Sequence, residues 1–156
     1  MSSSAAEFGA RRATPADAVD LAPRLRRSDV EEIWAASASG PNDALLRAVE
    51  ADGWAGTVDG QVEAIFGVAP VTLLGGVGCI YLLGSDAIER HAVPFLRLSR
   101  RYVEAMREDY AVLTNWVDAR NETSIRWLRW LGFAIMSPAP FGPFGLPFHR
   151  FEMRHV

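Results

Sequence analysis

The side chains that most often carry chemistry are few in this chain, and their spacing limits the kinds of site it could form. The three histidines, His91, His149 and His155, have no partner at the spacing that metal ligands use. The single cysteine, Cys79, lies inside an apolar run, where a thiol is expected to be buried and inert. We therefore predict no metal site, and no Ser/His/Asp or Cys/His constellation can be proposed from spacing.

Length and composition indicate one globular domain. The chain has 156 residues, of which 49% are hydrophobic and 22% charged, as expected for a chain that builds one packed core. Residues 1–6 are small and polar and are predicted to be disordered, so the domain spans residues 7–156. All 16 basic residues are arginine, and the net charge is -3. This charge gives no strong signal for nucleic acid, although a local arginine cluster could hold a phosphate.

The compartment is predicted from three features. A single cysteine excludes an intrachain disulfide, which fits a reducing environment. The first ten residues lack the basic-then-apolar pattern of a signal peptide. The longest apolar stretch, residues 71–84, is interrupted by glycines and is too short to span a bilayer. We therefore expect no membrane segment and a cytosolic location at synthesis.

Three helix starts are predicted in the first third of the chain. Thr14 is placed to cap a helix whose first position is Pro15. Ser28 and Glu31 have the spacing of a capping box. Asn42 follows Gly40-Pro41 and could cap a third helix. A mainly helical layer is expected here, after a first strand.

The remaining two thirds show strand patterns interrupted by two helices. Asp59-Gly60 is a strong two-residue hairpin turn. A helix over 94–108 repeats its apolar residues at spacings of three and four, and a helix over 123–131 is closed by Gly132. The predicted strands cover residues 8–13, 54–58, 61–68, 77–83, 112–118, 133–136 and 148–154.

This order of elements predicts an α/β (α+β) fold with a mixed sheet flanked by helices. One segment is more specific. Asn121 is followed by Ser124 three residues on, Trp127 six on, and Gly132-Phe133 eleven and twelve on. Together with the element order, these offsets resemble the GNAT superfamily of acetyltransferases. The resemblance implies a seven-stranded, mostly antiparallel sheet with a V-shaped gap between its fourth and fifth strands, where acetyl-CoA would bind.

A narrower resemblance extends over most of the chain. Its segments are similar to the internal virion protein A family of short-tailed phages and prophages, whose members are GNAT-like in fold. These segments are residues 25–32, 66–70, 82–86, 115–121 and 125–128. The resemblance implies a role in virion assembly or the particle interior, other phage structural proteins as partners, and a location in the host cytoplasm at synthesis and later in the virion interior.

The GNAT resemblance also sets what a working enzyme would need at the phosphates of acetyl-CoA. Backbone N–H groups at the start of the helix after the fourth strand must hold the pyrophosphate, and glycines let the backbone approach it. In residues 84–94 the only glycine is Gly84. Asp86 and Glu89 add negative charge where phosphates would lie, and Pro94 removes a donor. Acetyl-CoA is therefore a possible ligand at a poorly preserved site.

Six residues are the expected contacts of such a donor. They are Leu82, Leu83, Arg90, His91, Asn121 and Trp127. Arg90 and His91 could compensate for the missing glycines, or could be ordinary solvated charges.

Two further groups are expected to handle protons in a GNAT enzyme. A tyrosine seven residues after the asparagine commonly protonates the leaving thiolate, but Leu128 stands there. The base that deprotonates the amine would be Glu32 or Asp118. The alternatives are a surface helix charge for Glu32, and for Asp118 a cap or a salt bridge with Arg120 or Arg126.

Two classes of function follow. The first is a phage assembly protein with vestigial catalysis, which acts through protein contacts and could be a homo-oligomer. The apolar connection over 138–147 would either form such an interface or fold back on the core. The second is an acetyl-CoA-dependent N-acetyltransferase that acts on an unknown amine. Ligand binding without turnover in the same gap is a third, weaker possibility.

Overall fold

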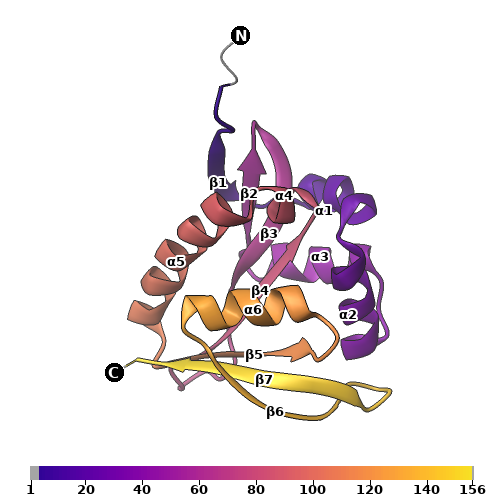
Figure 1. Cartoon of the computed structure of the whole chain (residues 1–156), viewed down its shortest axis with the longest axis vertical. Coiled ribbons are helices and arrows are strands. Elements are labelled where there is room, and N and C mark those ends of the chain that lie inside the picture. Colours follow the sequence, from indigo (N-terminus) through magenta and orange to yellow (C-terminus); the bar gives the residue numbers. More distant parts are fainter. Residues whose placement is uncertain (1–3, 156) are drawn as a thin grey trace.

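The computed structural model describes residues 4–155, which form a seven-stranded sheet flanked by helices (Figure 1). The strand order is β1-β2-β3-β4-β5-β7-β6, and every neighbouring pair is antiparallel except β4 and β5. The strands are β1 (Phe8–Arg12), β2 (Trp54–Val58), β3 (Gln61–Pro70), β4 (Val77–Gly84), β5 (Val112–Asp118), β6 (Ala134–Phe141) and β7 (Leu146–Arg154). The predicted fold class is confirmed.

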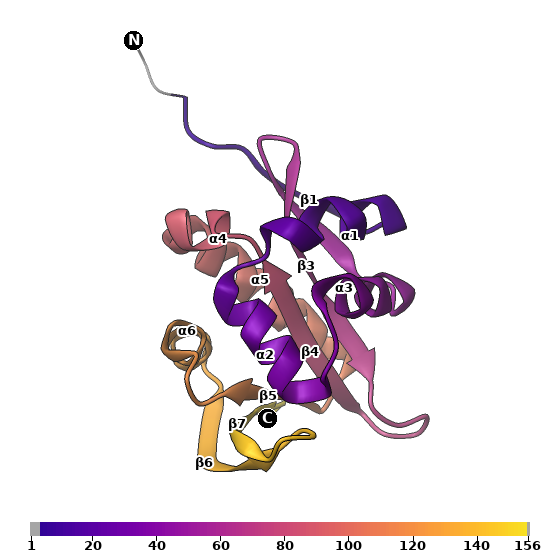
Figure 2. The ribbon, with the colours of Figure 1, turned by 90° about the vertical axis from the view of Figure 1, so that its right-hand side faces the viewer.

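Helices cover both faces of this sheet (Figure 2). They are α1 (Pro15–Leu21), the short 3-10 helix η1 (Ala22–Arg24), α2 (Arg27–Ser37), α3 (Pro41–Glu50), α4 (Ala87–Arg90), α5 (Ala92–Asp109) and α6 (Glu122–Leu131). One hydrophobic cluster joins α1 to α3 with the β2–β3 face, and a second joins α5 and α6 with β5 and β7. None of the described helices is long and apolar enough to cross a membrane.

Several local signals act as the sequence predicts. Thr14 caps α1, and its side chain and that of Asp17 each accept a backbone N–H from the other residue. Asp59 and Gly60 both have positive φ, the geometry of the tight hairpin turn between β2 and β3. Gly132 ends α6 at φ 102°, a conformation that favours glycine. These signals fix where the elements begin and end.

Two helix starts differ from the prediction. Helix α2 begins at Arg27 after Arg26, so Ser28 lies inside it and Glu31 pairs with Arg27 instead of closing a capping box. Helix α3 begins at Pro41 after Gly40, so Asn42 is not its cap. Proline suits the first helical position because its fixed φ matches the helix and it has no N–H to leave unpaired.

The predicted loop over 138–147 is instead largely strand, because β6 and β7 continue into a hairpin. Phe148 is fully buried, and Phe141 packs between it and Trp116. Phe144 stacks on Trp34, 5.7 Å between ring centroids. The apolar segment therefore folds back on the protein. The predicted disorder over 1–6 falls partly on residues 1–3, which lie outside the described residues.

Candidate functional site

The sheet opens between its only parallel pair of strands. Strands β4 and β5 pair over three positions, from Val77 opposite Val112 to Cys79 opposite Thr114. Just beyond these pairs, the Asn115 side chain donates a hydrogen bond to the Ile80 carbonyl at 2.7 Å. Further along, a gap separates the two strands, and α6 follows β5 directly beside it (Figure 1).

The backbone of β4 alternates between its neighbour β3 and this gap. The Ser85 N–H donates to Glu63 on β3, whereas the Gly84 N–H donates away from β3 to the Asp29 carboxylate at 2.9 Å. Because the direction alternates along a strand, Leu82 turns its N–H and C=O toward the gap, while Leu83 pairs with Ile65. Of the two predicted contact residues, only Leu82 offers backbone hydrogen bonds there.

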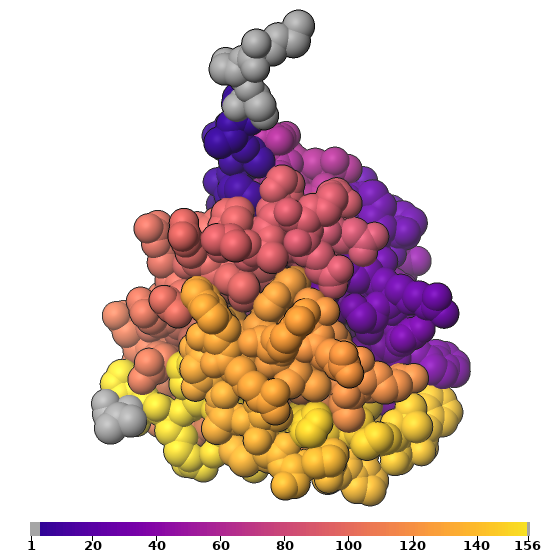
Figure 3. Space-filling model, viewed as in Figure 1, coloured from indigo at the N-terminus to yellow at the C-terminus, as the bar shows by residue number. Residues whose placement is uncertain are grey.

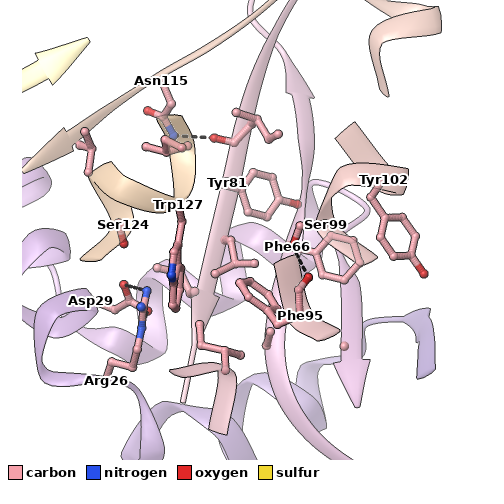
Figure 4. A pocket seen from close by; sticks show the side chains of 18 of the residues that line it. Arg26, Asp29, Phe66, Tyr81, Phe95, Ser99, Tyr102, Asn115, Ser124 and Trp127 are labelled. Carbon is pink, nitrogen blue, oxygen red and sulfur yellow. Dashed lines mark hydrogen bonds and ion pairs between the residues drawn. The ribbon is translucent and has the colours of Figure 1, made fainter. Parts of the chain in front are cut away.

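A cavity of about 650 Å³ lies around this gap (Figure 4). Its lining includes Leu82, Leu83 and Trp127 among the predicted donor contacts, and Glu32 among the predicted bases. Most of the other lining side chains are aromatic or aliphatic, from the sheet, α5 and α6, with smaller contributions from α2, α3 and α4. A largely apolar cavity with few polar groups is the usual form of a small-molecule site.

Glu32 is the ionisable group whose surroundings are best suited to proton transfer. Its carboxylate accepts the Asp118 backbone N–H at 2.6 Å and the Asn121 side-chain amide at 3.2 Å. Burial raises the pKa of the Glu32 carboxyl to about 7, and the negative charges of Asp29 and Asp118 add to the rise. The carboxyl is thus divided between its two forms near neutral pH, as a general base requires.

Asp118 has a different environment. Its carboxylate binds the Arg120 guanidinium at 2.7 Å and accepts the Arg120 backbone N–H. Burial alone would raise the pKa of Asp118, but these bonds to Arg120 hold it below its usual value. Asp118 therefore forms the salt bridge with Arg120 that the sequence offered as the alternative to a role as base. It does not line the cavity.

Asn121 joins the start of α6 to Glu32. Its side-chain oxygen accepts the Ser124 N–H at 3.3 Å and so caps the helix, while its amide group donates to Glu32. Asn121 itself is buried and lies outside the cavity lining. In this structure it positions Glu32 and the helix start.

The expected phosphate end of the gap is occupied by the short helix α4. The N–H groups of residues 88–91 donate to backbone carbonyls of residues 85–87, and that of Phe95 donates to His91. Pro94 has no N–H to offer. The cradle of N–H groups that can bind a pyrophosphate at a helix start is therefore reduced here to those of Ala92 and Val93, in the first turn of α5.

The two predicted compensating residues lie apart from the cavity. Arg90 is exposed at the end of α4, and the His91 ring packs edge-on against Phe8, 5.6 Å between centroids. Neither residue lines the cavity. A role for them at the phosphates remains a prediction.

Sequence reasoning missed a buried ion pair at this end. Arg26 and Asp29 are each 2% exposed and form two hydrogen bonds, at 2.8 and 3.1 Å. The Arg26 guanidinium lies 5.3 Å from the ring of Trp127, which in turn contacts Phe95 (Figure 4). Arg26 and Asp29 are three residues apart at the start of α2, and this spacing could have suggested an ion pair. The same spacing is equally common in exposed pairs, so it does not predict burial.

These contacts bring α5 and α6 together over the gap. In the space-filling view, the residues of α5 and α6 form adjoining bands across one face of the molecule (Figure 3). Trp127 and Phe95 are the aromatic contact between the two helices, 5.4 Å between centroids. The described residues contain no group of three or more side chains that could hold a metal ion.

Comparisons with known proteins identify the fold. No family model matches the chain, and no curated protein matches its sequence. Solved structures do match, among them Ard1 from Thermoplasma volcanium, with 16% identity, 96% and 98% of the two chains covered, and a TM-score of 0.74. A ribosomal-protein-alanine N-acetyltransferase from Brucella melitensis has 20% identity, 94% and 99% coverage, and a TM-score of 0.68.

A third match is a putative acetyltransferase from Salmonella typhimurium whose structure contains its cofactor acetyl-CoA. It has 16% identity, 94% and 93% coverage, and a TM-score of 0.65. The chain therefore has the fold of the GNAT acetyltransferases. The resemblance to phage internal virion proteins has no support in these comparisons.

Proposed function

We propose that the protein is an acyl-CoA-dependent N-acyltransferase in which Glu32 is the general base. The observation that carries this proposal is a carboxyl with a pKa of about 7 on the wall of an apolar cavity, beside the gap in a GNAT fold. A carboxylate in this setting accepts a proton readily at neutral pH, because the protonated form is uncharged and suits its surroundings.

The proposed reaction joins an amine to the acyl group of a thioester. The amine nitrogen attacks the thioester carbonyl, the new C–N bond forms, and the C–S bond breaks. Glu32 takes the proton that the nitrogen loses, and the sulfur leaves as a thiolate. A thiol has a pKa near 8.5, so this leaving group can depart without a proton from position 128, where leucine offers none. The thiolate then takes a proton from water.

The site suits one part of acyl-CoA better than the other. The free N–H and C=O of Leu82 can pair with the amides of the extended pantetheine arm, as an added strand pairs with a sheet edge. The pyrophosphate has a reduced cradle, because α4 uses the N–H groups of residues 88–91 and leaves those of Ala92 and Val93 at the start of α5. We expect the protein to bind CoA thioesters chiefly through the arm and the acyl group.

Release of thiol from acetyl-CoA tests the proposal. The protein is incubated with acetyl-CoA and a panel of primary amines, and the free thiol is measured against amine-free controls. We expect release that depends on both the protein and at least one amine. If millimolar acetyl-CoA gives no release with any amine, and no heat of binding, the proposal is wrong.

A second candidate function is a binding role in phage assembly, with other virion proteins as partners. One feature that favours protein contacts is the β3–β4 connection, where Leu73 and Leu74 are fully exposed and Val71 is 55% exposed. Exposed apolar side chains that lie together are typical of interaction surfaces. If the chain is absent from purified particles and recovers no phage structural protein from induced cells, this role is excluded.

A further inference from the structure

Helix α5 packs loosely on the sheet. It has 18 residues, with apolar side chains along one face, but Val103 is its single buried residue. The inward side chains Phe95, Leu98 and Tyr102 are half-buried and line the cavity. A helix with this much apolar surface would normally bury it against the sheet, so the space beneath α5 belongs to the cavity.

The floor beneath α5 combines small residues with Phe66. Phe66 touches Tyr102 at 4.9 Å between ring centroids, which shows that this side of β3 faces α5. Ala64 lies two residues away on the same side and is opposite Gly56 on β2, which is opposite Ala10 on β1. These small residues, beside the ring of Phe66, leave a chamber between α5 and β1–β3.

The chamber contains few groups that a polar ligand could use, chiefly the hydroxyl of Tyr102. The Ser99 hydroxyl faces it but donates to the Phe95 carbonyl at 2.8 Å (Figure 4). The arginines and glutamate of α5 that alternate with the apolar residues do not line the cavity, whose ionisable acids and bases lie elsewhere around it. Apolar walls of this kind suit an alkyl chain.

The chamber is continuous with the gap at Leu82 and Glu32, since all these residues line one cavity. The whole cavity, gap and chamber together, has a volume of about 650 Å³, in the range of sites for drug-sized ligands, and an acetyl group of three heavy atoms at the gap would leave the chamber empty. The weak phosphate end also means that binding must come from elsewhere on the donor.

We propose that the acyl donor carries an unbranched chain of medium length, whose tail lies in the chamber beneath α5 while its thioester lies at the gap. This inference rests on the proposed acyltransferase function and names its donor class. The apolar chamber binds the tail, the free backbone of Leu82 binds the arm, and Glu32 faces the reacting end.

Affinity as a function of chain length tests the inference. The intact protein is titrated calorimetrically with acetyl-, hexanoyl- and decanoyl-CoA, and with free decanoate. We expect binding to tighten by up to about fourfold for each added methylene until the chamber is full. The Ser99→Leu variant fills the chamber from α5 and should lose at least tenfold of the preference for decanoyl-CoA over acetyl-CoA.

The matched control is Ala105→Leu, which adds the same side chain at an exposed position of the same helix. Gly56→Val fills the chamber from the floor and should act like Ser99→Leu. Equal affinity for all three thioesters would overturn the chain-length inference and leave the acyltransferase proposal intact. Binding of decanoate but of no CoA thioester would overturn both, as would no binding at all.

Discussion

The two ends of the gap between β4 and β5 have opposite characters. At one end, Glu32 is a carboxyl with a raised pKa and lies on the wall of a cavity. At the other, the N–H groups of residues 88–91 are already bonded within the chain, and the Arg26–Asp29 pair lies buried under Trp127. A fold can thus keep the environment for proton transfer while most of its backbone cradle for a phosphate is used within the chain.

The largest effect is expected at Glu32. The Glu32→Gln variant keeps the shape of the side chain but cannot take a proton. We expect the turnover number to fall by about 10²- to 10⁴-fold, with little change in the affinity for acyl-CoA. Steady-state kinetics and a titration measure the two quantities separately. Asp118→Asn is the control variant. If it loses as much turnover as Glu32→Gln, Glu32 cannot be singled out as the general base.

The next effect concerns the stability of the other end. Asp29→Ala leaves the Gly84 N–H without its partner and the buried Arg26 guanidinium with only the longer contact to Glu89, at 3.4 Å. Breaking a buried ion pair typically costs about 3–5 kcal/mol, which chemical denaturation would detect. Glu31→Ala breaks the exposed pair with Arg27 in the same helix, and we expect it to leave the denaturation midpoint nearly unchanged. Equal midpoints for the two variants would show that the buried pair is not a structural anchor.

The pH dependence should report Glu32. Since the base works as a carboxylate with a pKa of about 7, kcat/KM should rise almost tenfold per pH unit below that value and level off above it. The same raised pKa means that the folded state holds a proton that the unfolded state releases near pH 4.5. The contribution of Glu32 to stability is therefore fully present below about pH 4.5 and is lost as the pH rises through 7. A rate that is flat from pH 5 to 8 would contradict this role.

The smallest effect is expected at the phosphate end. Glu89 contacts Arg26 at 3.4 Å and adds negative charge near the expected phosphate position. In Glu89→Gln we expect a twofold to fivefold tighter binding of CoA, because partly exposed charges contribute about 1 kcal/mol or less. The matched control is Glu104→Gln, which changes the same charge on the exposed side of α5. If Glu89→Gln and Glu104→Gln bind CoA with equal affinity, the phosphates do not lie near Glu89.

The sequence alone predicts those features that residues close together in the chain determine. The Thr14 cap, the Asp59-Gly60 turn and the Gly132 helix end are local, and their geometry was predicted correctly. The setting of Glu32 depends on an N–H donated by Asp118, 86 residues away. Neither the sequence around Glu32 nor the sequence around Asp118 carries a pattern that predicts this contact.

The same limit applies to the other features that sequence reasoning missed. The sequence shows that α4 contains no glycine. It does not show which carbonyls accept the N–H groups of these residues. The Pro/Gly/Phe composition of 138–147 suggested a loop, yet pairing between β6 and β7 determines its structure. The chamber beneath α5 depends on three strands and a helix together, so no single segment predicts it.

Calorimetric titration of the unmodified protein with acetyl-CoA tests the central claim most directly. We expect saturable one-to-one binding that is weak, because the arm and the acyl group must hold the ligand with a reduced phosphate cradle. We also expect that plain nucleotides, which share the phosphates but not the arm, bind more weakly still. No detectable heat with millimolar acetyl-CoA, or equal affinity for acetyl-CoA and a plain nucleotide, would contradict it.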